Sequence, residues 1–180
     1  MRKRVPLLAA AAGLSLALMG SAPPRRASPR ADDAAILARF EEMVSADIAC
    51  AQLAVERGHS KDVRDFAGVL VREHGMARQM AREVATQIHV TLKPSDDGPR
   101  HAEHDKIVKA LKDRPDIAFD ILFVRHEVDY HKELVDLINK TWLPAAQNED
   151  LKAFLSQVGP AFEAHSTMAA ALWQRVAPPR

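Results

Sequence analysis

The chain has 180 residues, of which 47% are hydrophobic and only 5% aromatic, and it contains seven glycines. It is long enough for one domain with a hydrophobic core, and its alanine-rich, glycine-poor composition is typical of an all-α protein. Its 25 Lys and Arg residues nearly balance its 24 Asp and Glu residues, which excludes the concentrated basic face that nucleic-acid binding requires.

Residues 1–22 have the three parts of a secretory signal peptide. Basic residues 2–4 precede an apolar run from Leu7 to Met19, and small residues follow it. The run is too short to span a bilayer, although an uncleaved anchor is the alternative interpretation. Removal of residues 1–22 leaves 22 basic against 24 acidic residues and no membrane-spanning segment. We therefore expect an exported protein, and its single cysteine, Cys50, excludes an internal disulfide.

The mature chain is expected to form one helical domain after a short tail. Residues 23–31, rich in proline and arginine, are predicted to be a disordered linker, and residues 32–177 a four-helix bundle domain. Residues 89–114 form a long connection between the second and third helices, with a short helix near residues 103–112. A connection of this length can cross the whole bundle, as it does in ferritin-like folds. The predicted fold is thus an all-α, ferritin-like four-helix bundle.

Residues with known capping preferences mark the ends of the four long helices. We expect the helices at about residues 33–57, 61–88, 116–143 and 149–176. Their N-terminal positions are assigned to Asp32 or Asp33, Ser60, Pro115 and Asn148. Gly58 suits the end of the first helix, and Pro160, inside the fourth, should kink it.

Each predicted helix has an apolar stripe, at alternate steps of three and four residues, that contains one polar residue. The third stripe consists of Ile117, Ile121, Val124, Val128, His131, Val135, Ile138 and Trp142. The polar members of the four stripes are Asp47, His74, His131 and His165. Each lies near the middle of its helix, so all four are expected within about one turn of the bundle midplane.

Three imidazoles and one carboxylate that meet in an apolar core have the composition of a metal site. Tetrahedral ligation by Asp47, His74, His131 and His165 fits Zn²⁺ best, while Fe, Mn and Cu remain alternatives. Two other interpretations are a metal-free hydrogen-bonded network and a haem held by two of the histidines. The Glu-x-x-His motif of dinuclear iron oxidases is missing before each histidine, which argues against that chemistry.

Several nearby residues are candidates for supporting roles. Glu127, one turn before His131, and Glu73, beside His74, are candidate acceptors for imidazole N–H groups. Cys50, one turn after Asp47, is a further candidate ligand. The remaining histidines look weaker, and His126 is expected to be exposed.

The sequence resembles a known family of exported bacterial proteins, domain-of-unknown-function family 4142, described as outer-membrane or ferritin-like proteins. Four stretches carry the resemblance: residues 46–57, 66–74, 119–131 and 161–165. The recurring histidines of that family fall on His74, His131 and His165, and its first-helix acid, more often Glu, falls on Asp47. The resemblance implies a ferritin-like bundle outside the cytoplasm, periplasmic or associated with the outer membrane. It implies no particular activity.

These patterns support three hypotheses for function. The first is a non-catalytic bundle that binds one transition-metal ion and serves metal handling or protection against envelope stress. The second is an interaction module whose buried histidines only pack, with an unidentified protein partner. The third is a metal-dependent redox enzyme of the superoxide-converting type, which would use the same three histidines and one aspartate.

Overall fold

The computed structural model describes residues 29–92 and 99–177, so the predicted signal peptide and most of the predicted linker lie outside the described residues. Four long helices form the bundle: α1 (Pro29–Arg57), α2 (Lys61–Gln87), α4 (Asp116–Asp136) and α6 (Glu149–Val176). A π-helical segment, η1 (Leu137–Trp142), and a short helix, α5 (Leu143–Ala145), extend α4. Helix α1 begins inside the range predicted as linker.

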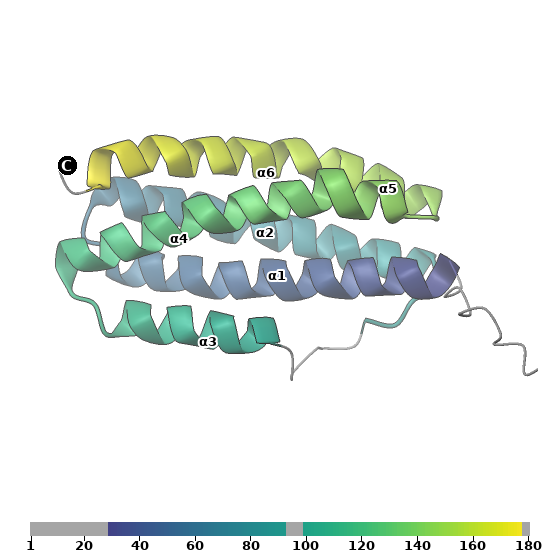
Figure 1. Ribbon diagram of the computed structural model, residues 1–180, viewed down its shortest axis with the longest axis horizontal. Coiled ribbons are helices and arrows are strands. Elements are labelled where there is room, and N and C mark those ends of the chain that lie inside the picture. The colour runs from purple at the N-terminus through teal and green to yellow at the C-terminus, as the bar shows by residue number, and fades with distance from the viewer. Residues whose placement is uncertain (1–28, 93–98, 178–180) are drawn as a thin grey trace, which may run out of the picture.

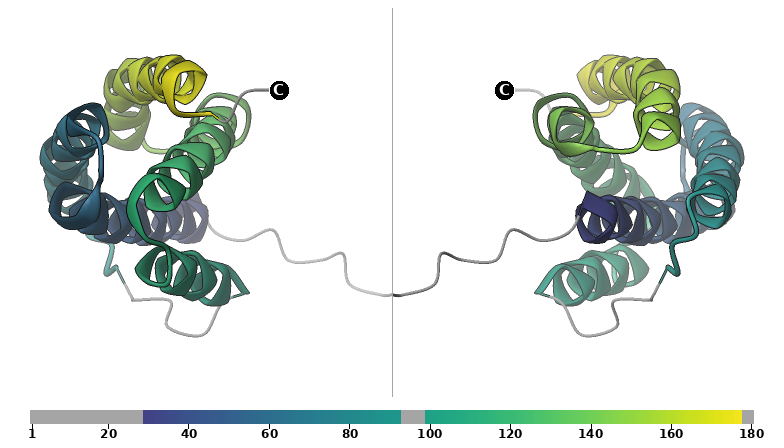
Figure 2. Two further views of the ribbon diagram at one scale, coloured as in Figure 1. Left: turned by 90° about the vertical axis from the view of Figure 1, so that its left-hand side faces the viewer. Right: turned by 90° about the vertical axis from the view of Figure 1, so that its right-hand side faces the viewer.

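The long connection between α2 and α4 carries helix α3 (Pro99–Lys112), as predicted, and α3 lies outside the bundle against α1 (Figure 1). Seen along the bundle axis, α1, α2, α6 and α4 follow one another around the core (Figure 2). Within the described ranges, no helix has both the length and the hydropathy required to cross a bilayer.

Two of the predicted N-terminal caps are confirmed. The Ser60 hydroxyl accepts a hydrogen bond from the Val63 backbone N–H at 3.2 Å, and the Asn148 side chain accepts from the backbone N–H groups of Asp150 and Leu151 in the first turn of α6. Gly58 follows the last residue of α1 at a position without room for a side chain, since a Cβ there would lie 2.6 Å from the Ala54 carbonyl oxygen. Pro160 lies inside α6, which continues on both sides of it.

Asp33 has a different role from the predicted one. Because α1 begins at Pro29, Asp33 is not its cap; its buried carboxylate instead accepts hydrogen bonds from the backbone N–H groups of Gln147 at 2.8 Å and Asn148 at 3.0 Å. At the other end of the bundle, the carboxylate of Asp120 on α4 likewise accepts from two consecutive N–H groups in the α1–α2 turn, each at 2.8 Å. Each aspartate thus ties the start of one helix to the turn that precedes another.

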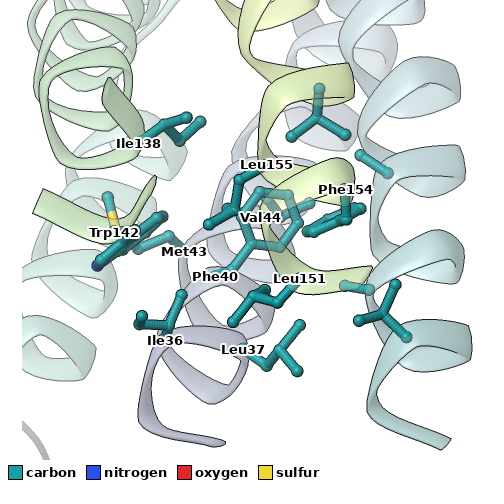
Figure 3. Packing of buried hydrophobic residues seen from close by; sticks show 14 of the residues in the cluster. Ile36, Leu37, Phe40, Met43, Val44, Ile138, Trp142, Leu151, Phe154 and Leu155 are labelled. Atoms are coloured by element: carbon teal, nitrogen blue, oxygen red, sulfur yellow. The ribbon is translucent and has the colours of Figure 1, made fainter. Parts of the chain in front are cut away.

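The apolar core consists of two clusters separated by a polar layer. One cluster surrounds Phe40, whose ring makes edge contacts with Trp142, Phe154 and Phe162 at centroid distances of 5.0 to 6.2 Å (Figure 3). The other is built around the α1–α2 turn and includes Phe119 and Phe123 of α4. The polar members of the four stripes lie between these clusters.

The stripe predicted for the third helix is partly wrong. Ile117 is 57% exposed, whereas Phe119, Phe123 and Glu127 are buried. Helix α4 packs against α1, α3 and α6, so its buried face is wider than a single apolar stripe. The bulky phenylalanines occupy that face in its first half, since they bury more apolar area than isoleucine or valine. From His131 onward the predicted positions Ile138 and Trp142 are buried.

Candidate metal centre

The structure brings the four predicted site residues together at the middle of the bundle. Asp47 comes from α1, His74 from α2, His131 from α4 and His165 from α6. The first three are fully buried and His165 is 2% exposed. Glu127, one turn before His131, is fully buried beside them. The expectation of one inward polar residue per helix at a common height therefore agrees with the coordinates.

One nitrogen of each imidazole faces the other two rings. His74 Nε2 lies 3.1 Å from His165 Nδ1 and 3.4 Å from His131 Nε2. Nitrogens bound at about 2.0 Å to one tetrahedral ion would be about 3.3 Å apart. The spacing of the three rings therefore matches the spacing of ligands around a single ion.

The second nitrogen of each ring faces an oxygen acceptor. His74 Nδ1 is 2.9 Å from Asp47 Oδ2, and His165 Nε2 is 2.8 Å from Glu73 Oε2. His131 Nδ1 is 3.1 Å from the Glu127 carbonyl oxygen and 3.3 Å from its carboxylate. For His131 and His165 these contacts are hydrogen bonds that favour an N–H on the outer nitrogen, which leaves lone pairs on His131 Nε2 and His165 Nδ1. These two nitrogens lie 3.4 and 3.1 Å from His74 Nε2, and the ligand atoms of the three rings all lie within 4.8 Å of one another. A proton on His74 Nε2 can serve only one of the two lone pairs, whereas a metal cation can accept one from each ring.

The buried carboxylates of the centre lack directed hydrogen bonds. Among the described residues, neither oxygen of Asp47 and neither oxygen of Glu127 has a hydrogen-bond partner. The 2.9 Å approach of Asp47 to His74 is close enough for an ion pair but lies off the hydrogen-bonding direction. Asp47 Oδ2 also lies 3.7 Å from His131 Nε2, and Asp47, Glu127 and His131 form a second group of neighbouring ligand atoms.

Burial and mutual charge shift the titration of these groups. Burial raises the pKa of Asp47, but the charge and hydrogen-bonding capacity of His74 outweigh it and hold that pKa well below its ordinary value. Burial, followed by the charge of Asp47, raises the pKa of Glu127 well above its ordinary value. Burial lowers the pKa of His131 to about 4, and burial also lowers the pKa of His165. These shifts disfavour a charged imidazolium at His131 and at His165 at neutral pH.

The surroundings seal most of the centre from water. The Phe162 ring stacks on His74 with centroids 4.8 Å apart. On the α1–α4 side lies a cavity of about 830 Å³ beneath α3, whose wall includes Tyr130 and His126. The Tyr130 hydroxyl donates a hydrogen bond to the Met43 carbonyl oxygen at 2.7 Å, which anchors this part of the cavity wall. His126 is partly buried against Tyr130, so the expectation that it is exposed was wrong.

The supporting residues are placed partly as expected. Glu127 faces His131, as the sequence suggested. Glu73 was considered because it neighbours His74, yet its carboxylate contacts His165 on the facing helix. Cys50 is buried with its Sγ 3.9 Å from His104 Nδ1 of α3, and it belongs to neither ligand group found among the described residues.

The bundle, its helix-bearing crossover and its buried polar layer define a ferritin-like helical protein. In structure the chain is similar to one described as "Crystal structure of DUF305 fragment from Deinococcus radiodurans", with a TM-score of 0.70 and 16% sequence identity over 84% of this chain and 99% of that chain. The likeness supports the predicted fold class.

The chain belongs to the family described as Domain of unknown function (DUF4142), whose profile matches residues 19–172. The family resemblance noted from the sequence is thus confirmed. No curated protein matches the chain in sequence.

Proposed function

We propose that this protein binds one transition-metal ion at the centre of its bundle, through His74 Nε2, His131 Nε2 and His165 Nδ1. The observation that carries the proposal is the orientation of the three rings. Each turns one nitrogen toward the other two rings and the other toward an oxygen acceptor. Carboxylate or carbonyl acceptors on the outer nitrogen are the usual partners of metal-bound histidines, because they fix the tautomer and the ring orientation.

The charge of the centre supports a divalent cation. Asp47 and Glu127 are fully buried and have no cation among their hydrogen-bond partners. An uncompensated buried charge is costly, and a 2+ ion would balance both carboxylates at once. One ion therefore serves two purposes: it accepts a nitrogen lone pair from each ring, and it balances Asp47 together with Glu127 when Glu127 loses its proton.

The donor set favours zinc. We assign the fourth position of a tetrahedral ion to Asp47, whose Oδ2 lies 3.7 Å from His131 Nε2 and would have to turn from His74 Nδ1, 2.9 Å away, toward the ion. Three imidazole nitrogens and one carboxylate oxygen suit Zn²⁺, and Fe, Mn or Cu bind the same donors. Glu127 then accepts from His131 Nδ1 rather than binding the ion.

The biological role that best fits this centre is metal holding in a compartment outside the cytoplasm, periplasmic or at the outer membrane, for metal handling or protection against envelope stress. The signal-peptide pattern of residues 1–22 supports export. The burial of all four proposed ligands, none more than 2% exposed, favours retention of an ion over turnover of a substrate.

The metal content of the purified protein tests the proposal. The protein should be made without a metal-affinity tag, dialysed and analysed by inductively coupled plasma mass spectrometry. We expect about one transition-metal ion per chain, as for a single-ion site. The variant His131→Leu should retain the fold by circular dichroism and lose the ion.

Two outcomes would contradict the proposal. One is wild-type protein that stays metal-free after exposure to Zn²⁺, Fe²⁺, Mn²⁺ and Cu²⁺ in turn. The other is an ion that His131→Leu binds as tightly as the wild type. Either result would leave a bundle whose histidines form a metal-free polar network.

A further inference from the structure

The three histidines of the centre differ in what lies behind them. The outer partners of His74 and His131 are Asp47 and Glu127, both fully buried. The outer partner of His165 is Glu73, whose side chain is 34% exposed. Among the described groups of the centre, this contact alone joins a ring directly to a carboxylate at the surface.

The opposite side of the centre is closed more firmly. The cavity beneath α3 comes near the centre at Tyr130, but that side chain is anchored to the Met43 carbonyl oxygen at 2.7 Å and packs against His126 with ring centroids 5.1 Å apart. Displacing Tyr130 would break this hydrogen bond. Between α2 and α6, by contrast, His165 is in direct contact with a carboxylate whose side chain is 34% exposed.

We propose that the metal ion reaches the centre between α2 and α6, and that Glu73 is the surface carboxylate that first binds it and passes it to His165. This inference rests on the proposed metal site. The carboxylate of Glu73 lies 2.8 Å from His165 Nε2, directly behind the ring whose Nδ1 faces the centre, so an ion captured by Glu73 has this ring to pass. A swing of the His165 side chain that breaks the Glu73 contact lets the ion through, and the ring returns with Nδ1 toward the ion and its proton still on Nε2.

A second charge at the same place should oppose this step. The Arg72 guanidinium lies 3.1 Å from Glu73 Oε1 and competes with an arriving cation for that carboxylate. The Arg72 side chain is 60% exposed, so its removal should disturb the core little. The two neighbours therefore give substitutions with opposite expected effects on the rate of metal uptake.

The test is stopped-flow uptake of Zn²⁺ by metal-free protein, paired with release into excess chelator. Glu73→Gln keeps an oxygen that accepts from His165 Nε2 but removes the charge. We expect its uptake and release rates to fall together by about tenfold, with Kd within about threefold of wild type, since electrostatic steering changes rates by about tenfold or more. Arg72→Gln should take up Zn²⁺ faster than wild type. The matched control Glu83→Gln removes a carboxylate from the same helix, where it accepts a hydrogen bond from Gln79, and should leave both rates unchanged.

The outcomes separate this inference from the proposed function. Wild-type protein that binds no metal contradicts the metal site itself. If the wild type binds metal and Glu73→Gln has the same uptake and release rates, the access path is overturned but the metal site is not. A Glu73→Gln variant with unchanged uptake and faster release also overturns it, because that pattern is expected of a residue that only orients His165. Faster uptake by Tyr130→Phe than by wild type would place the path through the cavity instead.

Discussion

Four carboxylates are buried in the described part of the bundle, and they form two contrasting pairs. Asp33 and Asp120, near the two ends, each accept hydrogen bonds from two consecutive backbone N–H groups at 2.8 to 3.0 Å. Asp47 and Glu127, at the centre, accept none. The fold thus supplies donors to buried acids that tie helices together. The pair without donors lies beside three imidazole lone pairs, where a cation would compensate both.

Removal of the metal should have the largest effect on stability. If a divalent ion compensates the central pair, chelation should lower the free energy of unfolding by roughly 3–4 kcal/mol, the linkage expected for free metal at about 100 to 1,000 times Kd. Urea unfolding with and without EDTA measures this difference. His131→Leu should show no response to EDTA. A wild type that is equally insensitive would mean that no ion compensates the central pair.

Substitution of the terminal pair should cost less and should not depend on metal. Asp120→Asn turns one acceptor into an amide donor that faces a backbone N–H, so a buried N–H loses its partner at a cost of about 1–3 kcal/mol. Asp33→Asn should behave in the same way, with or without EDTA. Asp47→Asn, by contrast, should weaken the protein chiefly when metal is present. A cost for Asp47→Asn that is the same in both conditions would remove the contrast between the pairs.

The central pair should also give the metal-free protein a distinctive pH dependence. The raised pKa of Glu127 means that, above its ordinary value of 4.5, the folded chain keeps a proton that the unfolded chain has lost. Protonated Glu127 therefore costs the fold nothing below pH 4.5, and the free energy of unfolding declines as pH rises from 4.5 toward the pKa of Glu127 in the folded protein. Glu127→Gln removes this decline and should be more stable than wild type near pH 8 but not near pH 4.

Urea unfolding of metal-free wild type and Glu127→Gln across this range checks the sign of the effect. His131 affects stability in the opposite direction: because burial lowers its pKa to about 4, the folded protein becomes less stable as pH falls below 6.5. Both proteins contain His131, so the difference between their unfolding free energies reports on Glu127. A difference that does not change with pH would show that Glu127 is compensated without metal.

The smallest predicted effect provides a baseline away from both pairs. A Cβ added at Gly68, inside α2, would meet no atom within 4 Å. Gly68→Ala should therefore stabilise the protein by about 0.5–1 kcal/mol through helix propensity, equally with and without metal. Thermal melting measures the shift, and a loss of stability would indicate packing against this face of α2.

Local sequence patterns predicted the histidines better than they predicted the acids. The stripes of α1, α2 and α6 placed Asp47, His74 and His165 correctly because each polar residue replaces one member of a regular apolar series. On α4 the same stripe pattern predicted that Ile117 is buried and missed Phe119. Both positions fit a helical period, and which of them is buried depends on the helices packed against α4, including α3.

The remaining acids depend on contacts across long stretches of chain. Asp33 binds backbone groups 114 and 115 residues away, and Glu73 meets a histidine 92 residues away, so no local motif identifies either partner. Glu127 could be suggested from its spacing to His131. Its complete burial, and the missing donors around it, could not be read from the sequence because they depend on all four helices.

The most direct test is anomalous diffraction from crystals of the untagged protein, collected on both sides of the absorption edge of the metal found by elemental analysis. The account predicts one strong anomalous peak in the polar layer, at about 2.0–2.1 Å from His74 Nε2, His131 Nε2 and His165 Nδ1, the distance range of zinc–nitrogen bonds. An ordered bundle with no peak among these three rings, or with metal bound only at its surface, would contradict it.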